Sequence, residues 1–401
     1  MKSLYSLYRI GPGPSSSHTI GPKIAAEDFL SHLVDVDQID VFLYASFALT
    51  GPGHKTDLII KKVLKDYPTN IHFDIKEKSP HPNTVKFIGY KNNEPIIERT
   101  YLSIGGGELI CLEDDSVESK DIYPFNNFTE IKQYLYENNI TSLADFVYLY
   151  ENDDIKQYLS KILEAMFSSI EKGLSTEGKV QAGKNLFIDR VAPKLYQSQL
   201  NSSNKDNTML LASFAYAVSE ENASGGELVT APTCGSAGVL PAVLYYSYLS
   251  GKSNSELIDA LAVAGLVGNL FKQNATISGA VGGCQAEIGV AVCMASAALC
   301  HLDHLTIEQI EYAAELAMEH QLGLTCDPID GFVAIPCIER NAVGAVRALE
   351  SYTFAKWVST NRKNVMSLDD IIETMKITGD GLSSDYKETS IGGISKIRNK
   401  K

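Results

Sequence analysis

The segment SNSELIDALAVAGLVGNLF, Ser253–Phe271, decides the fold class of most of the chain. Its first four residues have a capping-box pattern, in which a serine and a glutamate three positions later bind each other's backbone N–H at a helix start. The alanine, leucine and valine residues that follow predict a long helix. A second capping-box pattern, Thr306–Gln309, predicts a helix that reaches His320. Residues 228–341 are rich in alanine and glycine and carry few charges, so we expect helices buried on several faces in a bundle.

The first third of the chain instead mixes strand and helix patterns. Three short segments rich in β-branched and aromatic residues predict strands: residues 39–49, 71–77 and 84–90. Thr56–Asp66 has apolar residues at helical spacing behind a threonine, and a further helix is expected after Pro22. The glycine triplet Gly105–Gly107 is typical of a bulge or a tight turn. These elements predict a small α/β domain at the N-terminus.

Helical segments dominate from about Asn126 to the end of the chain, and strand signals stop there. We therefore predict an α+β fold, in which a small N-terminal α/β domain, residues 1–135, precedes an all-helical domain, residues 136–401. The length of 401 residues suffices for about two or three domains, each with a core of its own.

Composition and charge narrow the class of function. The formal net charge of −14 opposes the phosphate neutralisation that binding to nucleic acid or to an anionic membrane requires. Met1–Ile10 lacks the apolar core of a signal peptide, and proline and glycine interrupt the longest uncharged run, between Glu227 and Lys252. We therefore expect a cytoplasmic protein that acts on a small molecule, with no nucleic-acid partner and no membrane partner.

Two loops in the first third carry histidines. In GPGPSSSHT, residues 11–19, four hydroxyls and an imidazole precede an expected helix, and such a loop can bind a carboxylate or phosphate. A Pro/Gly turn with a serine cap would have the same composition. GPGHKTD, residues 51–57, joins an expected strand to an expected helix, where ligand sites concentrate in α/β units. An unperturbed imidazole titrates near ~6.5, so His54 is a candidate acid or base, although a solvated loop histidine would have the same pattern.

Six of the seven cysteines lie from residue 234 onward, and their odd number without a secretory signal points to reduced thiols. Three of them lie beside glycine or proline in segments of broken helix: Cys284, Cys326 and Cys337. Backbone N–H groups exposed there can stabilise metal-bound thiolates, although scattered cysteines in a helical domain are also common core residues. Cys293 and Cys300, seven positions apart in an alanine-rich helix, have the pattern of core residues. No C-x-x-C pair occurs, which disfavours a zinc-finger or thioredoxin-type site.

Taken together, these segments resemble the iron-sulfur-dependent L-serine dehydratases, also called L-serine ammonia-lyases, in the single-chain form with fused β and α domains. The resemblance covers nearly the whole chain. The segments that carry it are GPSSSHTIGP (13–22), GHKTD (53–57), HPN (81–83), SIGGG (103–107), APT (231–233), GGCQ (282–285), EHQLGLTCDP (319–328), PCIERN (336–341) and YKETS (386–390).

The resemblance implies β-elimination of water from L-serine, giving pyruvate and ammonia for amino-acid degradation and gluconeogenesis. It implies a small N-terminal α/β domain joined to an all-helical catalytic domain that holds an oxygen-sensitive 4Fe-4S cluster. The cluster ligands would be Cys284, Cys326 and Cys337, with one iron left open to act as a Lewis acid toward the departing hydroxide.

A base must also remove the α-proton, and for this role we predict His54, with His18 beside the substrate and His81 near the pocket entrance. The hydroxyls of the first loop would hold the substrate carboxylate and so fix the α-carbon. The substrate-binding residues that we predict are Ser15, Ser16, Ser17, Thr19, Asn83, Arg340 and Asn341.

Three features depart from the family's pattern. Many relatives end with a cysteine that can cap the open iron, whereas residues 391–401 contain none, which puts inhibition by a tail thiolate in doubt. Relatives also tend to have a small or apolar residue at the position of Asp330, and a carboxylate there weakens the inference of substrate identity. Pro52 is unusual in the second histidine loop, and we expect it to stiffen the chain beside His54.

Three alternatives stay open at this point. A related cluster-dependent β-eliminase would act on L-cysteine or L-threonine, because a hydroxyl, a thiol and an extra methyl differ by only about 1–3 kcal/mol in an unspecialised pocket. A noncatalytic serine or oxygen sensor would have the same loops and cysteines. A pyridoxal-phosphate enzyme would need a Schiff-base lysine and a phosphate-binding glycine loop, and neither is evident. A homodimer is the commonest default for the oligomeric state.

Overall fold

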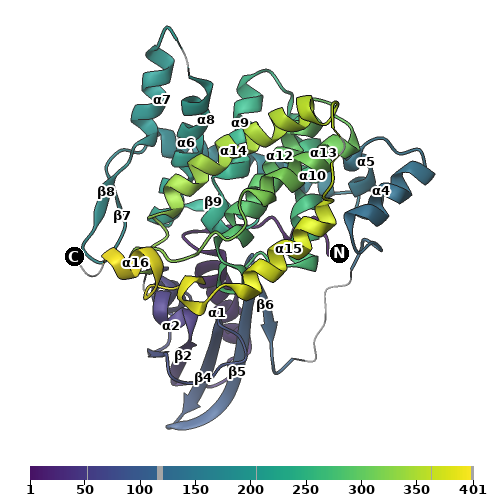
Figure 1. The fold of residues 1–401 in the computed structure, drawn as a ribbon. Helices are drawn as coiled ribbons and strands as arrows, with labels where there is room; N and C mark the ends of the chain where they lie inside the picture. The colour runs from purple at the N-terminus through teal and green to yellow at the C-terminus, as the bar shows by residue number, and fades with distance from the viewer. Residues whose placement is uncertain (52, 115–120, 205, 363, 399–401) are drawn as a thin grey trace.

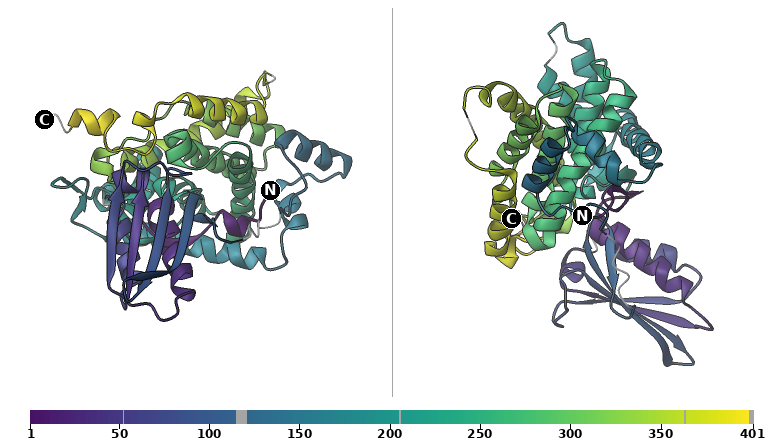
Figure 2. Two further views of the ribbon diagram at one scale, coloured as in Figure 1. Left: turned by 90° about the horizontal axis from the view of Figure 1, so that it is seen from below. Right: turned by 90° about the vertical axis from the view of Figure 1, so that its right-hand side faces the viewer.

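The computed structural model describes residues 1–398 except 52, 115–120, 205 and 363, so the expected effect of Pro52 lies outside the described residues. A five-stranded sheet with its helices lies below a larger helical body, and the two are joined through the first loop of the chain (Figure 1). Viewed from the side, the α/β region projects from the helical body (Figure 2). The fold is therefore α+β in broad terms, with the strands of the main sheet confined to the first third of the chain.

The main sheet has the strand order β3-β2-β4-β5-β6. Its strands are β2 (Gln38–Tyr44), β3 (Thr69–Asp74), β4 (Thr84–Lys91), β5 (Glu94–Gly105) and β6 (Glu108–Cys111). Only the β2–β3 pair is parallel, and α3 (Thr56–Val63) supplies the crossover between those two strands. Alternate residues of β2 and β4 point into a core that α1 (Gly21–Ser31) and α3 cover with Phe29 and Ile60.

The sequence-based prediction for residues 39–49 is wrong beyond Tyr44. The strand ends there, Ala45 adopts a φ of 46°, and Ser46–Thr50 form the short helix α2. A run of apolar residues of this length does not distinguish a strand from a strand that turns into a helix. The glycine triplet at residues 105–107 does form the turn between β5 and β6, since all three glycines have positive φ.

The region predicted to be all-helical also contains three short strands, which corrects that part of the prediction. They are β7 (Lys179–Gln181), β8 (Phe187–Asp189) and β9 (Glu227–Val229). β7 and β8 form a hairpin, whereas β9 pairs with β1 (Ile10–Pro12) near the N-terminus. Strands of three residues are too short to show the alternation on which a strand prediction rests.

The helical body surrounds α12 (Ile288–Leu302), which packs against α9, α10, α13 and α14. The other helices are α4 (Phe128–Glu137), α5 (Leu143–Tyr150), α6 (Ile155–Ser175), α7 (Ala192–Asn201), α8 (Asn207–Ser224), α9 (Val239–Leu249), α10 (Asn254–Asn274), α11 (Gly279–Gly282), α13 (Ile307–Glu319), α14 (Cys337–Val358), α15 (Leu368–Gly381) and α16 (Gly393–Arg398). Both predicted capping boxes are confirmed, at the start of α10 and at the start of α13. Cys293 and Cys300 are fully buried in α12, as their spacing predicted.

Within the described residues, Cys284–Leu302 is the one helical stretch that is long and apolar enough to cross a membrane. Its most apolar window is 89% buried inside the fold, so the apolar character is accounted for by packing in the centre of the bundle.

The N-terminal residues position the first histidine loop. Met1, Leu4 and Tyr8 are buried in the core of the helical body, and the Tyr8 hydroxyl donates to the carbonyl oxygen of Leu261 at 2.9 Å. After β1 the chain leaves this core and enters the core of the α/β region with α1. Residues 13–20 therefore lie where the two cores meet.

Candidate active site

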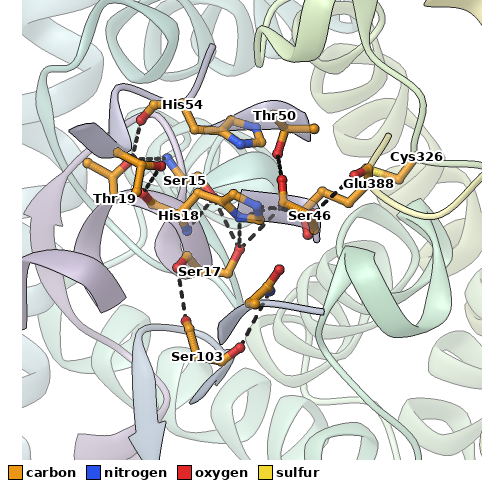
Figure 3. A network of polar contacts seen from close by, with 12 residues as sticks. Ser15, Ser17, His18, Thr19, Ser46, Thr50, His54, Ser103, Cys326 and Glu388 are labelled. Carbon is orange, nitrogen blue, oxygen red and sulfur yellow. Dashed lines mark hydrogen bonds and ion pairs between the residues drawn. The ribbon is translucent and has the colours of Figure 1, made fainter. Parts of the chain in front are cut away.

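The two histidine loops meet at this boundary (Figure 3). His18 lies in a short π-helix, Ser16–Ile20, and the centroids of the His18 and His54 rings are 4.5 Å apart. Both side chains are almost completely buried. Each loop also binds the backbone of the other, since Thr19 Oγ1 donates to His54 O at 2.8 Å and Thr56 Oγ1 donates to His18 O at 2.6 Å. The contact between the two histidines is therefore fixed on both sides.

Glu388, from the segment between α15 and α16, completes this cluster. Its Oε1 atom lies 3.1 Å from His18 Nδ1, and its carbonyl oxygen accepts a hydrogen bond from Ser46 Oγ at 3.2 Å. Ser46 Oγ in turn lies 3.1 Å from His18 Nε2. Ser17 Oγ, at 2.9 Å from His18 Nδ1, closes the network. His18, His54 and Glu388 thus form a buried group whose ligand atoms lie within 4.8 Å of one another.

These contacts hold the His18 ring at both of its nitrogens. Nε2 lies beside the Ser46 hydroxyl, which also donates to the Glu388 carbonyl. Nδ1 lies beside the Glu388 carboxylate, which when ionised only accepts hydrogen bonds, and beside Ser17 Oγ. His18 is therefore paired with Glu388 in a fixed orientation.

The electrostatics of the three residues agree with this arrangement. Burial alone would raise the pKa of Glu388, but the charge and hydrogen bond of His18 hold that pKa below its usual value. Burial, followed by the charge of His18, lowers the pKa of His54 to about 3. His54 is therefore neutral near pH 7, and its Nδ1 atom has no hydrogen-bond partner among the described residues. The neutral ring can accept a proton at this nitrogen, although the low pKa makes His54 a weak base.

Cys326, one of the three cysteines singled out in the sequence, lies on the other side of Glu388 from His18 (Figure 3). Cys284 begins a turn of 3-10 helix ahead of α12, Cys337 begins α14, and Cys326 lies in the extended segment between α13 and residue 329. Burial raises the pKa of all three thiols, and the charge of Arg340 opposes this shift at Cys284 and Cys337. The thiols also interact with one another, since the charge of Cys284 further raises the pKa of both other cysteines.

This donor set fits an iron-sulfur cluster. Thiolate sulfurs are the usual protein ligands of such clusters, and Cys284 and Cys337 each stand at the N-terminus of a helical turn. Arg340 adds a positive charge to compensate the thiolates. By contrast, Cys234 lies buried outside this set, and burial raises the pKa of its thiol.

One short segment connects the cysteines with the histidines. The backbone N–H of Cys326 donates to Tyr386 O at 2.7 Å, and that of Thr389 donates to Cys326 O at 3.1 Å. Glu388 lies between these two contacts and faces His18 (Figure 3). Ser390 Oγ also donates to Leu49 O at 2.9 Å, in α2 of the α/β region. The segment Tyr386–Ser390 therefore binds both parts of the site.

The structure brings most of the other predicted residues to the same place. Ser15, Ser16 and Ser17 are buried with His18. Asn83 is fully buried, and its side-chain amide donates to Ser103 O at 3.4 Å. His81 is half-buried, accepts a hydrogen bond from Asn83 N at 3.1 Å, and has a pKa lowered mainly by burial.

Two predicted substrate residues have contacts with the helical body instead. Arg340 contacts Cys284 and donates to Thr325 O at 2.5 Å. The Asn341 amide donates to Gly235 O and Cys337 O, and its oxygen accepts from Gly238 N. Their part in substrate binding stays a prediction.

The carboxylate of Asp330 accepts from Lys184 N at 3.0 Å in the turn of the β7–β8 hairpin.

Three site residues were not predicted: Ser46, Glu287 and Glu388. Ser46 follows the carboxyl end of β2, a position at which ligand residues are common. Glu287 accepts from Thr233 Oγ1 at 2.7 Å and lies 4.0 Å from Cys326 Sγ, and burial, then the charge of Glu388, raises its pKa to about 7. Glu388 lies in the YKETS segment, so the resemblance contained a signal for it, but its contact with His18 is purely tertiary.

Unpaired polar atoms gather around the same place. Six buried side-chain atoms in the described part of the chain have no hydrogen-bond partner, and four of them belong to His54, Asn83, Ser278 and Glu388. Asn83 is joined to the site through Ser103, whose carbonyl accepts from the Asn83 amide and whose hydroxyl donates to Ser17 O. Ser278 packs against Gly105, at the end of β5, the strand that contains Ser103. Because leaving a buried polar group unpaired costs about 1–3 kcal/mol, this arrangement points to a small ligand with several hydrogen-bonding groups.

Comparison with known families defines the class. The family model of the serine dehydratase beta chain matches residues 3–70, and that of the serine dehydratase alpha chain matches residues 78–395. The chain is thus a fused β and α chain, in which the first match ends inside β3 and the second begins between β3 and β4. It belongs to the L-serine dehydratase family.

Full-length relatives carry the same family name. An L-serine dehydratase of Helicobacter pylori strain J99 is 36% identical over 98% of both chains. L-serine dehydratase 1 of Escherichia coli K12 is 35% identical over 98% of this chain and 99% of the relative. An L-serine dehydratase of Haemophilus influenzae is 35% identical over the same shares.

Proposed function

We propose that the protein is an L-serine ammonia-lyase, which eliminates water from L-serine to give pyruvate and ammonia. The observation that carries this proposal is the buried pair of histidines, His18 paired with Glu388 and His54 neutral, in the same fold as two buried cysteines and one half-buried cysteine. Such a site can hold a charged amino acid and remove a proton from it. The names of the relatives support L-serine as the substrate.

We propose that Cys284, Cys326 and Cys337 hold a 4Fe-4S cluster in which one iron has no protein thiolate. When bound, this cluster supplies a Lewis acid for the departure of hydroxide, which is a poor leaving group. The buried sulfurs, the helix N-termini and Arg340 support this proposal, since all of them favour thiolate charge or ligation of a metal.

In the proposed reaction, His54 is the base. Its Nδ1 atom takes the α-proton, the electron pair of the Cα–H bond forms the Cα=Cβ bond, and the hydroxide leaves Cβ. The aminoacrylate product then tautomerises to an imine, which water hydrolyses to pyruvate and ammonia. We choose His54 over His18 because both ring nitrogens of His18 have partners, Glu388 and Ser46, whereas His54 Nδ1 has none within the described residues.

The remaining residues hold the substrate. We propose that the Ser15–Ser17 hydroxyls, with backbone N–H groups of their loop and the charge of His18, bind the substrate carboxylate. Thr19 supports both histidine loops through its bond to His54 O, and Asn83 offers its unpaired Oδ1 atom to the substrate. The predicted position of His81 near the entrance is supported by its partial exposure.

In this proposal the division predicted from the sequence is functional, with the histidines supplied by residues 1–135 and the cluster by residues 136–401. Glu388 is the exception, since it joins the histidines from the helical part. The cytoplasmic location and the homodimer stay predictions.

The test is anaerobic purification, reconstitution with iron and sulfide, and measurement of visible absorption together with pyruvate release. We expect a broad brown absorption that bleaches in air at the same rate as the activity is lost. A colourless protein that still makes pyruvate would exclude the cluster's role. A coloured protein that binds serine without product would favour the sensor alternative, and faster turnover of L-threonine or L-cysteine would change the substrate.

A further inference from the structure

We propose that Glu388 binds the α-ammonium group of the substrate through its Oε2 atom, while its Oε1 atom holds His18. This inference rests on the proposed function and names the residue that recognises the amino group of the amino acid. Glu388 is thereby both a substrate-binding residue and a positioning residue for His18.

The two oxygens of this carboxylate have different surroundings. Oε1 lies 3.1 Å from His18 Nδ1 and accepts from Ser17 Oγ at 3.4 Å. Only 5% of Glu388 is exposed, and its Oε2 atom is buried without a hydrogen-bond partner within the described residues. A carboxylate oxygen without a partner in such a place is costly, and a donor brought by a ligand would remove that cost.

The chemistry of the missing donor follows from the other unpaired atoms. The substrate is a zwitterion that brings three N–H donors and a positive charge. Of the unpaired acceptors around the site, His54 Nδ1 is needed for the α-proton, and Asn83 Oδ1 and Ser278 Oγ are neutral. Glu388 Oε2 is the unpaired acceptor that carries negative charge, and charge-assisted hydrogen bonds are about twice as strong as neutral ones.

The second carboxylate near the site is engaged elsewhere. Glu287 Oε1 accepts from Thr233 Oγ1 at 2.7 Å, and its Oε2 atom lies 4.0 Å from Cys326 Sγ. Glu287 therefore faces the cysteines, whereas Glu388 faces the histidines.

The order of His18 and Glu388 also matches the two ends of an amino acid. With the substrate carboxylate beside the Ser15–Ser17 loop and the His18 ring, the ammonium group would lie beside Glu388. The Cα–H bond between these two groups is then held near His54. A ligand without an ammonium group loses one of the two contacts that define this orientation.

The experiment compares Glu388→Gln with the wild-type holoenzyme, using L-serine and L-glycerate, which has a hydroxyl in place of the ammonium. KM for L-serine and the inhibition constant of L-glycerate are measured under anaerobic conditions, and calorimetry gives the affinity for L-glycerate. Both ligands have a carboxylate, so any general damage to the site affects both. We expect serine binding to weaken by about tenfold or more beyond the loss for glycerate.

Asp385→Asn is the matched control, because it makes the same change in an exposed carboxylate three positions earlier in the same segment. It should leave both affinities unchanged. Glu388→Asp keeps the charge and should restore most of the preference for serine over glycerate. Iron content and the midpoint of thermal unfolding show whether each variant is folded and loaded.

Unchanged serine binding in Glu388→Gln, or equal losses for serine and glycerate, would overturn the inference, as would a Glu388→Asp variant that loses the preference fully. These results differ from a failure of the proposed function, in which the wild-type holoenzyme itself makes no pyruvate from L-serine.

Discussion

His18 Nδ1 lies 3.1 Å from Glu388 Oε1, and both side chains are buried, with exposures of 0% and 7%. The two residues come from distant parts of the chain, one in the first loop and one just ahead of the last helix. A buried pair of this kind is compensated only while both partners are present.

Removing one partner should therefore destabilise the protein strongly. We expect Glu388→Ala to lower the free energy of unfolding by about 3–5 kcal/mol, because His18 would stay buried without its partner carboxylate. The His18→Ala, Glu388→Ala double variant should lose much less than the sum of the two single variants. Urea unfolding of all four proteins measures this, and strictly additive losses would contradict the ion pair.

His54→Asn should lower kcat by about 10²–10⁴-fold while the cluster stays bound, because general base catalysis typically contributes that much. His304→Asn is the control, since His304 is exposed and its φ of 55° is one that asparagine tolerates. Pyruvate release and visible absorption are recorded on the same samples. Full turnover of the His54→Asn variant would exclude His54 as the base.

The lowered pKa of His54 also predicts a dependence of stability on pH. In the unfolded chain this histidine takes up a proton near the ordinary imidazole pKa of 6.5, whereas in the folded chain its pKa is only about 3. The contribution of His54 to the free energy of unfolding is therefore complete above about pH 6.5. Below that pH the free energy of unfolding decreases as the pH falls toward 3, by up to about 1.4 kcal/mol per pH unit for this one proton. In a plot of the free energy of unfolding against pH, the His54→Asn variant should lack this part of the slope between pH 6 and 5. An identical slope for the variant would contradict the prediction.

Cys337→Ser should abolish stoichiometric binding of iron and sulfide, because only two thiolates would remain for the cluster. Cys293→Ala, in the core of α12, should keep the full content of both. Chemical analysis of iron and sulfide after reconstitution provides the measurement. A Cys337→Ser protein with unchanged iron content would mean that the three cysteines are core residues.

Local signals in the sequence predicted much of the fold. The capping boxes at Ser253 and Thr306 use contacts within one helical turn, so they could be identified without tertiary information. The turn of α2 after Tyr44 and the pairing of β9 with β1 depend on what each segment packs against. Neither is encoded in the period of the hydrophobic residues.

In the candidate site, too, the sequence reveals local features but not the tertiary contacts between them. Each histidine loop could be identified by its glycine, serine and histidine content, but nothing in either loop indicates that the rings lie 4.5 Å apart. Glu388 gives the clearest example, since a glutamate in a polar segment near the end of a chain is usually exposed. Its burial follows from the contacts of Tyr386 and Thr389 with Cys326, which a single sequence does not reveal.

The position of Glu388 has a consequence for how the protein is made. During synthesis on the ribosome, the residues of the histidine loops emerge more than 300 residues ahead of Glu388. Until Glu388 has left the exit tunnel, His18 lacks its partner carboxylate and the proposed ammonium site does not exist. A nascent chain that has not reached this residue therefore has both histidine loops but lacks the residue that joins them to Cys326.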